Sequence, residues 1–483
     1  MGILVAVLLT IVAFGVLAVA VVTALAVRRS GWRVLRTRLQ RSTRIWRLAA
    51  RRSLRFLHLR RRATQDQIDE FHLQTAEEVF ELMGGMKGAV MKLGQMVSIL
   101  GDTLPGAYSQ ALQGLQSQAP PMAYDLMATV VEEELGAPPE VVFRTFTTEP
   151  VAAASIGQVH RAVLDDGTEV AVKVQYPGVD VAIRADLDNA FLLTNVARMM
   201  APGIEPEPLV EELRKVIGDE LDYRKEAANQ EEFRRAYEGH PWVRIPSVLP
   251  EFSGRRVITS EWVSGRSFYD FLDAPQDVRD EVGEKLFRFF VGSVGVLRFF
   301  NADPHPGNYF FGDDGTVTFL DFGMVKRFSP EVMESLCAQI DALRAGDQER
   351  LRDAMVHHGW FKPAAPIDLD RLSALAHLTQ QPLVGRGPYT YTSDYMREVV
   401  EAAMSLQGPY ADVIKHMTVP PDHMMLNRIQ LGVGALLGRL RATGPWGAIF
   451  DEYLFGAAPA TPLGAAAAGW PRVQPDLAGE ISG

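Results

Sequence analysis

The stretch DPHPGNYFFGDDGTVTFLDFG, residues 303–323, places the tightest constraint on the fold of this 483-residue chain. Asp303 is followed five residues later by Asn308, and a second carboxylate, Asp321, stands directly before Phe-Gly. Turn formers between two short apolar runs are typical of a β-hairpin. If the ends of two strands meet, these carboxylate and amide oxygens could together bind a metal ion. Such oxygen ligands suit Mg²⁺.

A second stretch, VAAASIGQVHRAVLDDGTEVAVKVQ at residues 151–175, reads as a turn, a strand, a hairpin and a second strand ending near Lys173. The Asp-Gly pair at 166–167 is the hairpin signal. Aligned on the kinase pattern G-x-G-x-x-G-x-V, the four specified places are taken by Ala152, Ala154, Gly157 and Val159. This order predicts the roof of a kinase nucleotide site, with Lys173 as its strand lysine.

Together these residues resemble the UbiB family of atypical kinases, which is associated with coenzyme Q biosynthesis. The resemblance runs from about residue 84 to residue 330, with a weaker helical continuation to about residue 455. It implies an α+β, bilobal, protein-kinase-like fold with a helical N-terminal extension that bears the KxGQ motif. The residues that carry it, in chain order, are Lys92 and Gln95 of KLGQ, Ala152, Ala153, Ala154 and Ser155 of an alanine-rich loop, Lys173, Glu220 and Asp222 of ExD, Asp303, Asn308 and Asp321.

The resemblance implies a binding site for ATP or ADP with Mg²⁺. Asn308 and Asp321 are the expected metal ligands, and Asp303 is expected to orient an acceptor hydroxyl or a water molecule. In the family, the helix that carries KxGQ folds over the cleft and turns Lys92 and Gln95 toward the nucleotide. The alanines of the loop add methyl groups where backbone approaches phosphate, and the family resemblance implies that this suppresses ordinary transfer to proteins.

Two acidic groups are expected to pair with the lysines of the site. Glu226 lies one helical turn beyond Asp222, so we expect it to be the partner of Lys173, with Glu220 as the alternative. A buried Lys92 needs an acidic partner, and Glu220 and Asp222 are the candidates. Backbone groups of Glu261 and Val263, before a Ser-Gly pair, are the expected contacts of the adenine ring.

Residues 3–27 form an uncharged apolar run. As a helix it spans about 37 Å, enough to cross the roughly 30 Å core of a bilayer. A cleaved signal peptide is the competing interpretation, but no basic residue precedes the run and the run is too long. We therefore expect a single-pass anchor.

Fourteen arginines lie between residues 28 and 62, and no acidic residue precedes Asp66. Positive charge beside a span favours the cytoplasmic side, so the body is expected inside the cell at the membrane. The arginines alternate with apolar residues at near-helical spacing, which favours an amphipathic helix on anionic lipid over a solvated linker. Without them, the other residues hold 35 basic against 59 acidic groups, a net charge of −24.

The chain is accordingly divided into an anchor (1–27), a basic arm (28–63), a helical extension (64–148), an N-lobe (149–265), a C-lobe (266–455) and a disordered Ala/Gly/Pro-rich tail (456–483). One cysteine, Cys337, excludes an intramolecular disulfide.

The expected function is that of a membrane-anchored kinase or ATPase supporting isoprenoid-quinone biosynthesis or lipid handling. The expected partners are membrane lipids, quinone or isoprenoid intermediates and quinone-biosynthesis proteins, without nucleic acid; a homodimer stays open. The alternatives are a protein kinase acting in trans and a nucleotide-binding pseudokinase scaffold.

Overall fold

The computed structural model describes residues 122–154, 156–180, 218, 221–301, 304–404 and 408–470. The chain separates into two compact units, Met1–Lys87 and Gly88–Gly483, and all described residues belong to the second. The expected anchor, basic arm and KLGQ segment therefore lie outside the described residues. Among the helices that are described, none has the length and apolar character needed to cross a membrane.

The N-lobe is a five-stranded sheet in which β1, β3, β4 and β6 follow one another and β2 pairs with β3. The predicted strands and the hairpin at Asp166-Gly167 are present, and Gly167 takes the left-handed conformation (φ +91°) that the turn requires. The elements of this part are α6 Tyr124–Leu135, α7 Pro139–Val142, β1 Thr145–Phe146, β2 Ala152–Ala154, β3 Gly157–Val163, β4 Glu169–Gln175, α10 Tyr223–Ala236, β5 Val243–Arg244, η1 Pro250–Phe252 and β6 Val257–Glu261.

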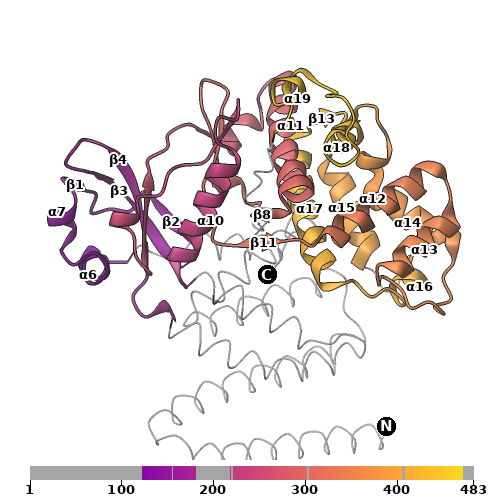
Figure 1. Cartoon of the computed structure of the whole chain (residues 1–483), viewed down its shortest axis with the longest axis horizontal. Helices are drawn as coiled ribbons and strands as arrows, with labels where there is room; N and C mark the ends of the chain where they lie inside the picture. Colours follow the sequence, from indigo (N-terminus) through magenta and orange to yellow (C-terminus); the bar gives the residue numbers. More distant parts are fainter. Residues whose placement is uncertain are drawn as a thin grey trace, which may run out of the picture. The chain divides into compact units, whose positions relative to one another are not determined.

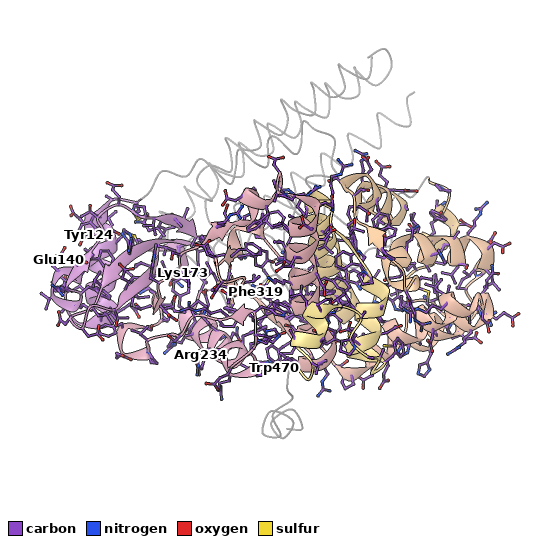
Figure 2. The ribbon with its side chains drawn as sticks, turned by 90° about the horizontal axis from the view of Figure 1, so that it is seen from above. Tyr124, Glu140, Lys173, Arg234, Phe319 and Trp470 are labelled. Atoms are coloured by element: carbon purple, nitrogen blue, oxygen red, sulfur yellow. The ribbon has the colours of Figure 1, made fainter. Side chains whose placement is uncertain are left out.

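The two faces of this sheet have different neighbours. Met127, Val130 and Val131 of α6 pack against the valines of β4 and β6, so α6 covers one face of the sheet. Glu134 at the end of α6 accepts a hydrogen bond from Arg256 Nε at 2.7 Å, which fixes the helix to the start of β6. Helix α10 lies on the opposite side of the sheet, as Figure 1 shows. Figure 2 labels Lys173 on that inner side, away from Tyr124 and Glu140, which mark α6 and α7.

The structure attaches a helix of the predicted extension to the N-lobe sheet, although the boundary between the two was predicted at residue 149. The apolar spacing of residues 124–135 predicts a helix, and α6 is present with these bounds. However, its apolar face forms one core with the sheet, and β1 pairs with β3. The N-lobe thus includes residues from Tyr124 onward, because the back face of the sheet needs a helix to bury its valines.

The C-lobe is mainly helical and holds the largest core. Its predicted hairpin is formed by β9 and β10, which pair antiparallel, while β5 adds to β10 in parallel. The elements are β7 Arg266–Ser267, η2 Phe268–Phe271, α11 Gln276–Gly292, η3 Ser293–Leu297, β8 Phe299–Asn301, η4 Pro306–Asn308, β9 Tyr309–Phe311, β10 Val317–Phe319, β11 Val325–Arg327, α12 Pro330–Ala345, α13 Gln348–His357, α14 Leu369–Val384, β12 Tyr389–Thr390, α15 Ser393–Met404, α16 Ala411–Ile414, α17 Pro421–Leu440, β13 Thr443–Gly444, α18 Trp446–Leu454 and α19 Pro462–Ala466.

The predicted disordered tail is wrong for the part of it that the structure describes. Helix α19 lies within this tail, and Thr461 caps it by accepting from Gly464 N. The Thr461 hydroxyl also accepts from Arg288 Nη2 at 2.9 Å and donates to Glu284. Composition alone indicated disorder because the segment is rich in alanine, glycine and proline, whereas a buried arginine of α11 holds it through polar contacts.

Candidate active site

A cleft of about 670 Å³ lies between the sheet of the N-lobe and the hairpin of the C-lobe. Its upper wall is built by strand register. Val159, Lys173 and Ile258 are directly opposite one another on β3, β4 and β6, and residues opposite one another share a face. Ala171 and Ser260 form the next row of the same face. All five of these residues line the cleft.

The alanine-rich segment forms a strand. Ala152, Ala153 and Ala154 make up β2, which pairs with β3 in a tight hairpin, and all three line the cleft. Ser155 lies outside the described residues. The pairing with β3 gives this alanine strand a fixed register above the cleft.

Gly157 is needed for a different reason from the one its motif position indicates. A Cβ atom at this position would lie 2.2 Å from the Val174 carbonyl oxygen and 3.0 Å from the Tyr223 hydroxyl. The glycine therefore allows β3 to approach β4, and it is absent from the residues that line the cleft.

Lys173 and Glu226 form the predicted pair. Lys173 Nζ donates to both carboxylate oxygens of Glu226, at 2.7 and 2.9 Å, and lies 5.1 Å from the centre of the Tyr223 ring. The Glu226 side chain is 6% exposed. Burial disfavours the charged ammonium, but the carboxylates of Glu226 and Asp321 outweigh it and raise the pKa of Lys173. The lysine is therefore a fixed cation at the cleft wall.

Helix α10 also holds the Asp-Phe-Gly segment. Asn229, one turn after Glu226, donates to the Phe322 carbonyl oxygen at 3.1 Å. Phe322 is fully buried, and its ring lies 4.8 Å from that of Phe233, two turns after Glu226. One face of α10 thus positions the strand lysine and the segment that follows Asp321.

The side chains expected to hold a metal are brought to one edge. Leu320 N donates to the Asn308 carbonyl oxygen at 3.1 Å, so the turn that ends in Asn308 is tied to the chain entering Asp321. Asp321 Oδ1 accepts from Gly323 N at 2.9 Å, and Asn301 donates to the Asp321 carbonyl. Asn308 and Asp321 both line the cleft. His305 Nδ1 accepts from Gly307 N at 3.1 Å, which shapes the turn before Asn308.

The other predicted residues divide into three groups. Glu261 and Val263 line the cleft, but the Glu261 backbone N–H donates to Ser247 at 2.9 Å, so this group is already engaged. Asp222 is absent from the cleft lining; it caps α10 by accepting from Arg224 N and pairs with the Arg224 guanidinium at 2.6 Å. Four predicted residues lie outside the described residues, namely Lys92, Gln95, Glu220 and Asp303.

Sequence reasoning missed Asn229, Asn301 and Tyr223. The signal for Asn229 was its position three residues after Glu226, which places both side chains on one helical face. Asn301 and Tyr223 offered no such spacing. Their roles depend on which strand and which helix meet at the cleft.

The comparisons agree with this geometry. The model of the ABC1 atypical kinase-like domain matches residues 114–355. The chain is 31% identical over 375 residues to the atypical kinase COQ8B, mitochondrial, of Rattus norvegicus, covering 76% of this chain and 69% of that protein. It is 29% identical over 396 residues to the atypical kinase coq-8, mitochondrial, of Caenorhabditis elegans, covering 79% of this chain and 51% of the relative.

A solved structure has a similar fold. The complex of Rv3197 with erythromycin from Mycobacterium tuberculosis matches with a TM-score of 0.61 and 29% identity, over 82% of this chain and all of that one. The fold and the cleft define a kinase-like protein. The chain belongs to the ABC1 atypical kinase-like family, the UbiB family.

Proposed function

We propose that this protein is a membrane-anchored atypical kinase or ATPase that binds Mg-ATP and supports isoprenoid-quinone biosynthesis or lipid handling. One observation carries the proposal. The Lys173–Glu226 ion pair, Asn308 and Asp321 line the same cleft of about 670 Å³. In kinases the corresponding lysine–glutamate pair and metal-binding aspartate must both be in place for phosphoryl transfer.

The residues of the cleft have separable tasks in this proposal. Glu226 holds the Lys173 ammonium at the cleft wall, where it neutralises phosphate charge. The paired strands β2 and β3 cover the phosphates, and the small side chains of Ala171 and Ser260 leave room for a planar base. Asn301 and Asn229 fix the carbonyl groups of Asp321 and Phe322, the two that follow the Asp321 side chain, so that its carboxylate keeps one orientation.

The donor set fits Mg²⁺. Asn308 and Asp321 supply an amide and a carboxylate oxygen, and hard oxygen ligands are those that Mg²⁺ prefers. The Leu320–Asn308 hydrogen bond keeps the two residues at one edge of the cleft. When bound, Mg²⁺ would supply positive charge that offsets the charge of the phosphate groups.

Two further parts of the proposal, the membrane anchor and the role in quinone biosynthesis, rest on the sequence and on similarity to relatives. Residues 3–27 are the proposed anchor, with the following arginines on the cytoplasmic side. The similarity to COQ8B and coq-8 supports a role in quinone biosynthesis. A free-standing protein kinase and a scaffold are less well supported, because the ion pair is formed and β2 is held in a fixed register.

Equilibrium binding of ATP to the full chain in detergent, with and without Mg²⁺, tests the proposal. Asp321→Asn should abolish the gain in affinity that Mg²⁺ provides, and Lys173→Met should weaken ATP binding with or without the metal. Asp394→Asn is the matched control, because Asp394 is exposed on α15 and pairs with Arg397. A wild-type chain that binds no nucleotide, or a control that loses as much as Asp321→Asn, would refute the proposal.

A further inference from the structure

The C-lobe contains a second cavity, of about 180 Å³, which shares no residue with the nucleotide cleft. Helices α11, α12, α14, α15 and α17 contribute to its wall. Its lining is mostly apolar and rich in aromatic rings, and it contains no charged side chain. The aromatic members are Phe287, Phe290, Trp360, Tyr391 and Tyr395.

Hydrogen bonds between helices fix part of the wall of this cavity. Pro382 lies inside α14 and cannot donate to the Leu378 carbonyl four residues earlier. The Tyr395 hydroxyl makes that bond instead, at 2.9 Å, so α15 takes over part of the hydrogen bonding of α14. Arg344 donates to the Leu383 carbonyl at 2.7 Å at the end of the same helix. Protein interiors are otherwise close-packed, and empty volume destabilises them.

Trp360 is a lining residue with an indole N–H whose hydrogen-bonding capacity is unused among the described residues. Trp360 is 7% exposed, and its indole N–H is buried without an acceptor in the described part of the chain. The backbone around it is fixed, because Trp360 N donates to Met355 O at 2.8 Å and Thr418 N donates to Trp360 O at 2.7 Å. A buried donor without an acceptor is costly, so an acceptor supplied from outside would be bound favourably.

We propose that this cavity binds a small neutral aromatic molecule with a carbonyl or ether oxygen, which accepts a hydrogen bond from the Trp360 indole. The volume sets the size, since an apolar cavity of about 150 Å³ holds benzene. The lack of charged lining excludes ions and nucleotides, because an unpaired charge is not stable in such surroundings. The unused donor selects for an oxygen. This site is independent of the proposed nucleotide chemistry.

Two probes of similar size test the proposal, acetophenone with a carbonyl oxygen and toluene without one. Binding to the full chain is measured by saturation-transfer NMR titration. Wild type should bind both. Trp360→Phe should weaken acetophenone binding by about three- to tenfold, the usual worth of one neutral hydrogen bond, and leave toluene binding unchanged.

A cavity-filling variant separates specific binding from partition into detergent. Ala376 is a buried lining residue of α14, and Ala376→Leu should abolish binding of both probes. Ala374→Leu on the exposed face of the same helix should leave both unchanged. The proposal is overturned if neither probe binds, if Ala376→Leu binds like wild type, or if Trp360→Phe weakens both probes equally. If Trp360→Phe fails to fold, the comparison of the two alanine variants decides.

Discussion

Two clusters of buried charge in this protein differ in what surrounds them. In the N-lobe, Lys173 pairs with Glu226, and the lysine side chain is 22% exposed toward the cleft. In the C-lobe, Arg288 is 1% exposed and donates to Glu284 at 2.6 Å, to Glu452 at 2.6 and 2.9 Å, and to Thr461. Both clusters place a cation against carboxylates away from bulk water.

The difference shows that buried charge alone does not identify a site. Arg288 is surrounded on all sides by its own chain and links α11, α18 and α19. The hydrogen bonds of Lys173 within the described residues go to one partner, and the ammonium borders open volume next to Asp321. We therefore interpret the Arg288 cluster as a brace and the Lys173–Glu226 pair as a binding group.

The largest effect is expected at the brace. Arg288→Met should lower the free energy of unfolding by about 3–5 kcal/mol, because two carboxylates lose their buried partner. Urea denaturation followed by circular dichroism measures the loss. The ATP affinity of the remaining folded protein should be unchanged. A loss of less than about 1 kcal/mol would show that the cluster behaves like a surface pair.

Substitution of Lys173, the binding group, should reduce activity more than stability. Lys173→Met is expected to reduce ATP turnover by about 10²- to 10³-fold, the usual cost of removing one group that stabilises developing charge. Its effect on the free energy of unfolding should be smaller than that of Arg288→Met, because Glu226 borders the cleft. Parallel turnover and denaturation measurements on both variants test the contrast. Equal losses of stability in Lys173→Met and Arg288→Met would contradict the distinction between a binding group and a brace.

Asn229 tests how the binding group is supported. Asn229→Ala removes the bond to the Phe322 carbonyl and should raise the Mg²⁺ concentration for half-maximal turnover by about tenfold, a typical effect of a residue that orients a metal ligand. The affinity of Asn229→Ala for ATP without Mg²⁺ should equal that of wild type. Gln276→Ala is the control, since Gln276 also bonds a backbone carbonyl, that of Arg441, outside the cleft lining. A change in the control of the same size would mean a general loss of structure.

The last effect concerns pH. Burial lowers the pKa of His240 from 6.5 to about 4, and its Nδ1 accepts from Val243 N at 3.0 Å. The unfolded chain therefore binds this proton more readily than the folded chain, and the stabilisation present above pH 6.5 is lost as the pH falls toward 4.

Wild type should lose up to about 3 kcal/mol more stability than His240→Asn between pH 7 and pH 4, since asparagine keeps an acceptor but does not titrate. Denaturation curves for both proteins across this range give the difference. Parallel profiles would show that His240 does not contribute.

Local patterns predicted much of the fold. The bounds of α6, the turn at Gly167 and the β9–β10 hairpin follow from periodicity and turn residues that act over a few positions. The attachment of α6 to the sheet did not follow, because an apolar helical face does not specify which surface it covers. Helix α19 was missed for a related reason, since its contacts depend on Arg288, more than 170 residues earlier.

The candidate site was predictable where two groups had to be complementary. A strand lysine requires a carboxylate, and helical spacing pointed to Glu226. The amides of Asn229 and Asn301 hold backbone carbonyls, which every residue has, so no pattern revealed their partners. Gly157 illustrates the converse, because its motif position indicated the nucleotide site, whereas the structure requires a glycine there for the close approach of the Val174 carbonyl in the next strand.

The placement of Thr461 has a consequence for shortened versions of the protein. A chain ending at Phe455 looks harmless by composition, since what it discards is mostly alanine, glycine and proline. It would nevertheless remove the hydroxyl that bridges Arg288 and Glu284, together with the Ala460 N–H that donates to Glu452 at 2.6 Å. In such a protein, water would reach one end of the ion cluster around Arg288. The loss of stability would therefore fall on the C-lobe, whereas the sheet of the N-lobe would be unaffected.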